Sequence, residues 1–217
     1  MIPNAKWIRP AQTTGDVCPV YSKQFSFFSS PNQSLSSVAH ATLSVTAMGV
    51  YEASLNGKRI GDFVLAPGWT SYRHRLQVQT YDVTELLSSE NELSILVGKG
   101  WYRSPLAWPD EAHRQQKAQI PAGLIALLTI TYTDGSTQLL PTGADWSAYE
   151  SNVRFSEIYD GETYDAAFDP SSAPIAIAEF DGPSDTLIAQ QGEKITEQER
   201  ILPARIFTTP AGETVVD

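Results

Sequence analysis

Val38-Ala39-His40-Ala41-Thr42-Leu43-Ser44-Val45 decides the fold, because apolar and polar side chains alternate along this stretch. A period of two places successive side chains on opposite faces of an extended strand. One face would carry Ala39, Ala41, Leu43 and Val45. The stretch therefore predicts a β-strand that buries one face in a core.

Similar runs surround this strand and are separated by turn residues. The runs span residues 20–27, 50–55, 59–65, 91–97, 124–133 and 136–140. Asn56-Gly57 and Asp134-Gly135 lie between paired runs, and such dipeptides favour tight hairpins because their residues tolerate positive φ. Many short strands with turns between them predict an all-β fold, specifically a β-sandwich or jelly roll.

Evidence for helices is sparse. Thr84–Leu87 is expected to form one helical turn after the polar corner at Asp82. Glu111–Ala118 contains helix-forming residues but no apolar stripe, so we expect a loop there. That loop would belong to a long aperiodic segment, Gly98–Ile120, of the kind that often carries function.

The second half of the chain predicts a domain boundary. Ser171–Pro183 is rich in Ala, Pro, Ser and Asp, as in a linker or an irregular sheet edge. We expect an N-terminal β-sandwich accessory domain over residues 1–185 and a junction over 186–217. Because Thr214–Asp217 reads as an interrupted strand, the junction is expected to lead into a further, truncated β-domain.

Composition limits the classes of partner. The net charge is −10, which disfavours nucleic acid and anionic membranes as partners. No apolar run approaches the roughly 20 residues of a membrane span. The first residues lack a signal-peptide core, and the single cysteine, Cys18, excludes an intrachain disulfide. These features favour a cytoplasmic protein, although a signal peptide could have been removed.

Several motifs, in order, resemble the N-terminal domain of bacterial α-L-rhamnosidases. They comprise residues 49–62 (GVYEASLNGKRIGD), 66–72 (APGWTSY), 81–84 (YDVT), 97–102 (VGKGWY), 158–166 (IYDGETYDA) and the run from 201–205 (ILPAR) to Val216 and Asp217. Each motif is moderately specific, but the ordered set spans most of the chain.

The resemblance implies a non-catalytic module that supports a glycoside hydrolase. In that family the catalytic carboxylates lie in a helical barrel, which would follow residue 217, and no catalytic residue is expected here. The accessory β-domains of the family are similar to galactose-binding jelly rolls. Downstream domains of the same polypeptide are then the expected partners. The alternative is an independent carbohydrate-binding module for rhamnose-containing glycans.

An acidic cluster has three interpretations. It consists of Glu157, Asp160, Glu162 and Asp165. The favoured interpretation is structural: Asp160-Gly161 forms a turn, and Glu162 or Asp165 accepts nearby backbone N–H groups. Asp160, Glu162 and Asp165 are alternatively candidate calcium ligands, because Ca²⁺ prefers oxygen. Catalysis is the least favoured, since a glycosidase places its two carboxylates on opposite sides of a cleft.

Aromatic residues suggest a sugar contact in the long segment. Trp69 and Trp101 are expected to pack in the core or at its rim. Candidate substrate-binding residues are Trp101, Tyr102, Arg103, Trp108 and Asp110. An exposed indole would stack on a sugar ring, while the charged side chains bind its hydroxyls. The same segment could instead cover a neighbouring domain. If that neighbour is missing, we expect the exposed patch to promote self-association.

Overall fold

The computed structural model describes residues 2–27, 34–105, 110–169 and 173–217, and its architecture is all-β. Strands in chain order are β1 Trp7–Pro10, β2 Pro19–Ser26, β3 Val38–Ala47, β4 Val50–Leu55, β5 Lys58–Arg59, β6 Leu76–Asp82, β7 Glu90–Gly98, β8 Leu124–Tyr132, β9 Thr137–Pro141, β10 Ser147–Glu150, β11 Val153–Glu157, β12 Gly161–Tyr164, β13 Ile177–Phe180, β14 Leu187–Ala189, β15 Ile206–Thr208 and β16 Thr214–Val216. Helical segments are η1 Leu35–Ser37, η2 Thr84–Leu86, α1 Gly100–Arg103 and α2 Glu111–Ala118.

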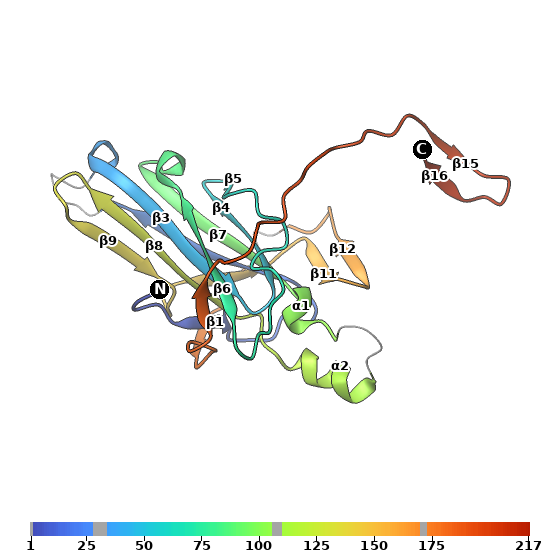
Figure 1. Cartoon of the computed structure of the whole chain (residues 1–217), viewed down its shortest axis with the longest axis horizontal. Helices are drawn as coiled ribbons and strands as arrows, with labels where there is room; N and C mark the ends of the chain where they lie inside the picture. Colours follow the sequence, from blue (N-terminus) through green and yellow to red (C-terminus); the bar gives the residue numbers. More distant parts are fainter. Residues whose placement is uncertain (1, 28–33, 106–109, 170–172) are drawn as a thin grey trace.

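Most strands belong to two sheets (Figure 1). The larger has the order β13-β1-β8-β3-β6-β14, with β9 paired to β8, and the smaller has the order β10-β2-β7-β4-β5. Neighbouring strands run antiparallel in both sheets, except that β14 runs parallel to β6. Two separate hairpins, β11–β12 and β15–β16, complete the described strands.

The main core lies between the two sheets. Leu43 and Leu128 of the larger sheet and Leu55 and Ile95 of the smaller sheet belong to one cluster of buried side chains. A second, smaller cluster includes Trp7 and covers the other face of the larger sheet. The alternation along β3 therefore buries one face against the smaller sheet, as the sequence predicts, for Ala41, Leu43 and Val45.

Both predicted hairpin turns are confirmed. Asn56 and Gly57 have φ values of 55° and 73°, and the turn joins β4 to β5. The side chain of Asn56 also accepts the backbone N–H of Glu92, at 2.9 Å, which ties the turn to β7. Gly135 has a φ of 82° between β8 and β9. The polar corner at Asp82 is confirmed as well, since its carboxylate accepts the N–H of Thr84 at 2.9 Å.

Three local predictions are wrong. Ala39 is exposed because the pairing of β3 with β8 shifts register between Val38 and His40. The expected strand over 59–65 ends at Arg59, because Ile60 and Phe63 turn into the core. Residues 111–118 form a helix rather than a loop.

The chain from residue 173 onward supplies a sheet edge and then an extended arm. β13 pairs with β1, so part of the expected linker is an edge strand. β14 adds to the larger sheet just after residue 185, and Val64 donates its backbone N–H to the carbonyl of Ile195. Residues 196–217, here called the C-terminal arm, then lead away to the β15–β16 hairpin (Figure 1).

In the part of the chain that the structure describes, no helix combines the length and apolar character needed to cross a membrane.

Candidate functional site

A close approach of backbone segments positions α1. A Cβ on Gly49, between β3 and β4, would lie 2.1 Å from the carbonyl oxygen of Gly98. Gly100 has a φ of 50°, and a Cβ there would lie 2.8 Å from the backbone nitrogen of Val50. Glycine at these positions therefore lets the end of β7 lie against the start of β4, and this contact directs the side chains of α1.

α2 is a polar helix held by local interactions. Asp110 is its N-cap and accepts the N–H of His113 at 2.8 Å. Glu111 accepts a bond from Gln115 one turn later, and Lys117 lies in the last turn, where a cation suits the helix dipole. None of its residues is buried, so the absence of an apolar stripe did not argue against a helix here.

The β11–β12 turn is organised by Glu157. Its carboxylate accepts the backbone N–H groups of Tyr159, at 2.5 Å, and Asp160, at 2.8 Å. Burial alone would raise the pKa of Glu157, but hydrogen bonds from Ser104 and from these N–H groups outweigh it and lower the pKa. Glu157 is thus an ionised structural group at neutral pH.

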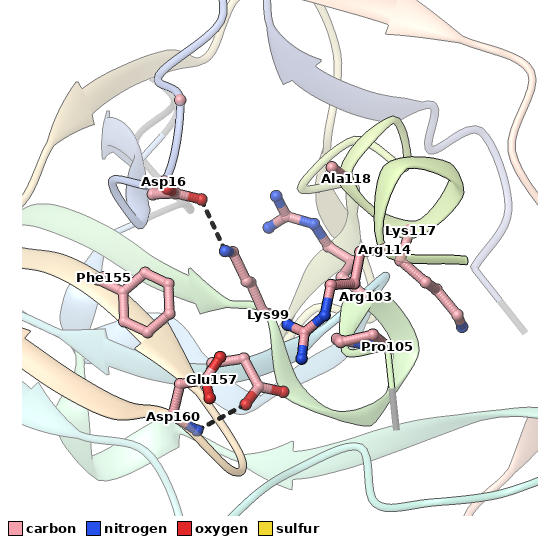
Figure 2. A pocket seen from close by; sticks show the side chains of 11 residues that line it. Asp16, Lys99, Arg103, Pro105, Arg114, Lys117, Ala118, Phe155, Glu157 and Asp160 are labelled. Atoms are coloured by element: carbon pink, nitrogen blue, oxygen red, sulfur yellow. Dashed lines mark hydrogen bonds and ion pairs between the residues drawn. The ribbon is translucent and has the colours of Figure 1, made fainter. Parts of the chain in front are cut away.

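These elements surround a cavity of about 250 Å³, here called the basic hollow (Figure 2). Its charged lining consists of the cations Lys99, Arg103, Arg114 and Lys117 and the anions Asp16, Glu157 and Asp160. The other lining residues are Gly15, Pro105, Ala118 and Phe155. Lys99 forms an ion pair with Asp16 at 2.6 Å and lies 4.4 Å from the centre of the Phe155 ring.

Two cations of the basic hollow are partly withdrawn from water. Arg103 donates to the carbonyl of Ile120 at 3.1 Å, and burial lowers its pKa. Lys117 donates to the carbonyl of Tyr102 at 3.0 Å. Burial, and then the nearby charge of Arg73, lower the pKa of Lys117. Among the described residues, no carboxylate forms a salt bridge with Arg103, Arg114 or Lys117.

An aromatic patch adjoins the basic hollow through α1. It consists of Trp69, Trp101, Tyr72 and Tyr102. The two indoles stack with centroids 6.2 Å apart and planes 9° apart, and the two phenol rings have centroids 4.6 Å apart. Tyr72 and Tyr102 pack against the smaller core cluster, whereas Trp69 is 63% exposed. Trp69 therefore lies outside the core.

The candidate substrate-binding residues are separated by the fold. Arg103 lines the basic hollow, while Trp101 and Tyr102 belong to the aromatic patch. Asp110 caps α2. Trp108 lies outside the described residues, so its predicted sugar contact stays a prediction.

The candidate calcium ligands are directed to different places. Asp160 lines the basic hollow, and Glu162 lines a second cavity beside Cys18. Asp165 accepts the backbone N–H of Ala167 at 2.9 Å. Over the described ranges, no group of three His, Cys, Asp or Glu side chains is arranged to hold a metal ion. The expected bonding of a carboxylate to nearby backbone is seen at Asp165, and Glu157, which was not named for it, makes such bonds as well.

Cys18 is not a nucleophile in this setting. The thiol is free and buried. Burial, the largest influence, raises its pKa to about 11. Because the thiolate is the reactive form, we infer that the thiol is inert at neutral pH.

Sequence reasoning did not find most residues of the basic hollow. Asp16 and Phe155, which were not candidates, come from segments far apart in the chain. One signal was available: residues 98–120 contain four Lys or Arg but two Asp or Glu, in a chain of net charge −10. A local excess of positive charge in an acidic protein indicates where an anionic group could bind.

Comparison with known proteins confirms the resemblance. Residues 36–199 match the α-L-rhamnosidase N-terminal domain family. The chain belongs to this family. An α-L-rhamnosidase of Streptomyces avermitilis is 36% identical over 183 residues, which cover 80% of this chain and 17% of the relative. The chain thus spans about a sixth of the length of that curated relative.

Solved structures of α-L-rhamnosidases share the fold. The native enzyme of Aspergillus terreus matches 99% of this chain and 26% of its own, with a TM-score of 0.84 and 30% identity. The Streptomyces avermitilis enzyme complexed with L-rhamnose matches 93% of this chain and 20% of its own, with a TM-score of 0.77 and 30% identity. This α-L-rhamnosidase N-terminal domain therefore corresponds to a fraction of each relative.

Proposed function

We propose that this domain is a non-catalytic module of an α-L-rhamnosidase-like glycoside hydrolase, where it supports the catalytic domain and contacts substrate. Its two packed sheets would be of the jelly-roll type found in galactose-binding domains. The partners would be downstream domains of the same polypeptide, because the relatives extend far beyond the matched region. Residues 186–217 would form the junction to the next β-domain.

The C-terminal arm is the observation that carries this role. From Thr196 onward, the hydrogen bonds among the described residues join the arm to itself, as between Arg205 and Asp217 at 2.7 Å. Ile206 and Val216 of its hairpin are 65% and 63% exposed. A two-stranded hairpin is marginal in water and presents open edges to which further strands can add. The arm is thus suited to packing in a neighbouring domain.

Two of the three carboxylates of the basic hollow do not suit glycoside hydrolysis. A glycosidase needs a general acid whose pKa is raised, opposite a second carboxylate. The pKa of Glu157 is instead lowered, and Asp16 is held in the ion pair with Lys99. Both carboxylates are thus engaged in structural interactions, which supports a module without hydrolase activity of its own.

We expect the purified chain not to release product from a chromogenic α-L-rhamnoside. The Streptomyces avermitilis relative serves as the positive control in the same assay. Turnover that persists through repeated purification, yet disappears in Glu157→Gln or Glu162→Gln, would show that the chain is itself an enzyme.

Exposure of Trp69 favours a second candidate, an independent carbohydrate-binding module. An exposed indole can stack on a sugar ring, and its fluorescence would then shift when rhamnose is added. The support module instead predicts self-association through the C-terminal arm and the aromatic patch, because both expose apolar side chains that a neighbouring domain would cover.

Sedimentation with and without rhamnose distinguishes the two candidates. We expect association that increases with protein concentration, is unaffected by rhamnose and is weakened by Ile206→Ser. His74→Ser, at another exposed position, is the control and should leave it unchanged. A monomer whose fluorescence responds to rhamnose, with the response abolished in Trp69→Ala, would instead establish the binding module.

A further inference from the structure

The basic hollow has a local charge opposite to that of the protein. Four cations line it against three anions, whereas the whole chain carries a net charge of −10. Two of the anions are already engaged, Asp16 by Lys99 and Glu157 by two backbone N–H groups. Arg103 and Arg114 are left at the cavity with no salt-bridge partner among the described residues, while the Lys117 side chain points away from it (Figure 2). Such a cavity favours an anionic ligand.

Holding these cations close together and partly away from water is electrostatically unfavourable, and a bound anion would offset this. Burial lowers the pKa values of Arg103 and Lys117, and Arg73 adds repulsion at Lys117. Charged groups that are partly desolvated without a counter-ion are a feature of binding sites more than of ordinary surfaces. Both side chains are nevertheless held in place by backbone carbonyls, so the site is preorganised.

Size and lining indicate the class of ligand. A cavity of about 250 Å³ falls just below the range of roughly 300–1,000 Å³ that holds drug-sized ligands, so one sugar ring suits it better than an oligosaccharide. Guanidinium groups pair with planar carboxylates through two parallel hydrogen bonds. Asp160 also lines the cavity, where its carboxylate could accept bonds from hydroxyl groups but would repel a simple inorganic anion.

We propose that the basic hollow binds a uronic acid residue, with its carboxylate against Arg103 and Arg114 and its ring hydroxyls toward Asp160. Figure 2 shows these side chains around the same cavity, between α1, α2 and the β11–β12 hairpin. The choice of a sugar as the carrier of the carboxylate rests on the proposed role in a glycoside hydrolase. The site would recognise an acidic unit of the substrate glycan.

Calorimetric titration of the whole chain with methyl α-D-galacturonoside and methyl β-D-glucuronoside tests this proposal. We expect at least one uronoside to bind at least tenfold more tightly than its neutral counterpart, the methyl galactoside or glucoside. Binding should weaken as salt rises, because the contacts are ionic. Inorganic sulfate at equal concentration should compete poorly.

Arg114→Gln is the informative variant, because Arg114 is exposed on α2 and its replacement should leave folding intact. We expect at least a tenfold loss of uronoside affinity. Arg200→Gln removes the same charge from the C-terminal arm and should bind as the wild type does. Circular dichroism and the melting temperature verify that both variants are folded.

Equal affinity for the acidic and neutral glycosides, no uronoside binding, or unchanged binding in Arg114→Gln would overturn the inference. Competition by sulfate as strong as that by the uronosides would also overturn it, since the site would then recognise charge alone. These outcomes leave the proposed function standing. That proposal fails separately, if the chain hydrolyses the chromogenic rhamnoside.

Discussion

Gly49→Ala is expected to destabilise the domain by about 3 kcal/mol, which corresponds to a melting temperature roughly 6–12 °C lower. The added Cβ would lie 2.1 Å from the carbonyl oxygen of Gly98, a distance at which the backbone must move. Val50 pairs with Gly98 in the β4–β7 ladder, so the movement would disturb the smaller sheet and α1 together. Thermal and urea unfolding followed by circular dichroism measures the change.

Gly192→Ala is the matched control for this substitution. A Cβ at Gly192 would meet nothing within 4 Å. The control should therefore unfold within about 0.5 kcal/mol of the wild type, as surface substitutions usually do. If Gly49→Ala were equally stable, the close approach of these backbone segments would not be needed to position α1.

Leu128→Ala is expected to cost about 3 kcal/mol, within the range of 2–5 kcal/mol for emptying a buried leucine site. Leu128 is 1% exposed in the middle of β8, and its strand neighbour Leu43 belongs to the same cluster. Loss of its side chain would leave a cavity between the two sheets. Urea denaturation gives the free energy of unfolding directly.

Leu139→Ala makes the same chemical change on β9, where the side chain is 41% exposed. We expect a loss below about 1 kcal/mol, because little apolar area returns to water. Similar losses in the two variants would contradict the assignment of the core to the space between the sheets.

The strands and their turns could be predicted because their causes are local. Alternation of apolar and polar residues along β3 requires a strand with one buried face. Asn56-Gly57 and Asp134-Gly135 adopt backbone conformations that few other dipeptides tolerate, with positive φ at Asn56, Gly57 and Gly135. The register shift at Ala39 was not predictable, since it depends on how β3 pairs with β8.

α2 was not predicted, because its sequence lacks the apolar stripe of an amphipathic helix. An amphipathic stripe is the sign of a helix that packs on a core. α2 is instead stabilised by its cap at Asp110 and by a bond between Gln115 and Glu111. The signals for this helix in the sequence were its helix-forming residues and the N-cap aspartate, which require no apolar face.

The sequence by itself determined the all-β class, the two hairpin turns and membership of a family, because each depends on residues adjacent in the chain or on motifs in order. The tertiary structure alone decided the basic hollow, which joins Asp16, Lys99, Arg114 and Phe155 from four separate segments. It also placed Asp160 and Glu162 in different cavities, although they are two residues apart. Asp160 lies in the turn and Glu162 in β12, so strand alternation does not place the two on one face, and the packing of distant elements decides what each side chain meets.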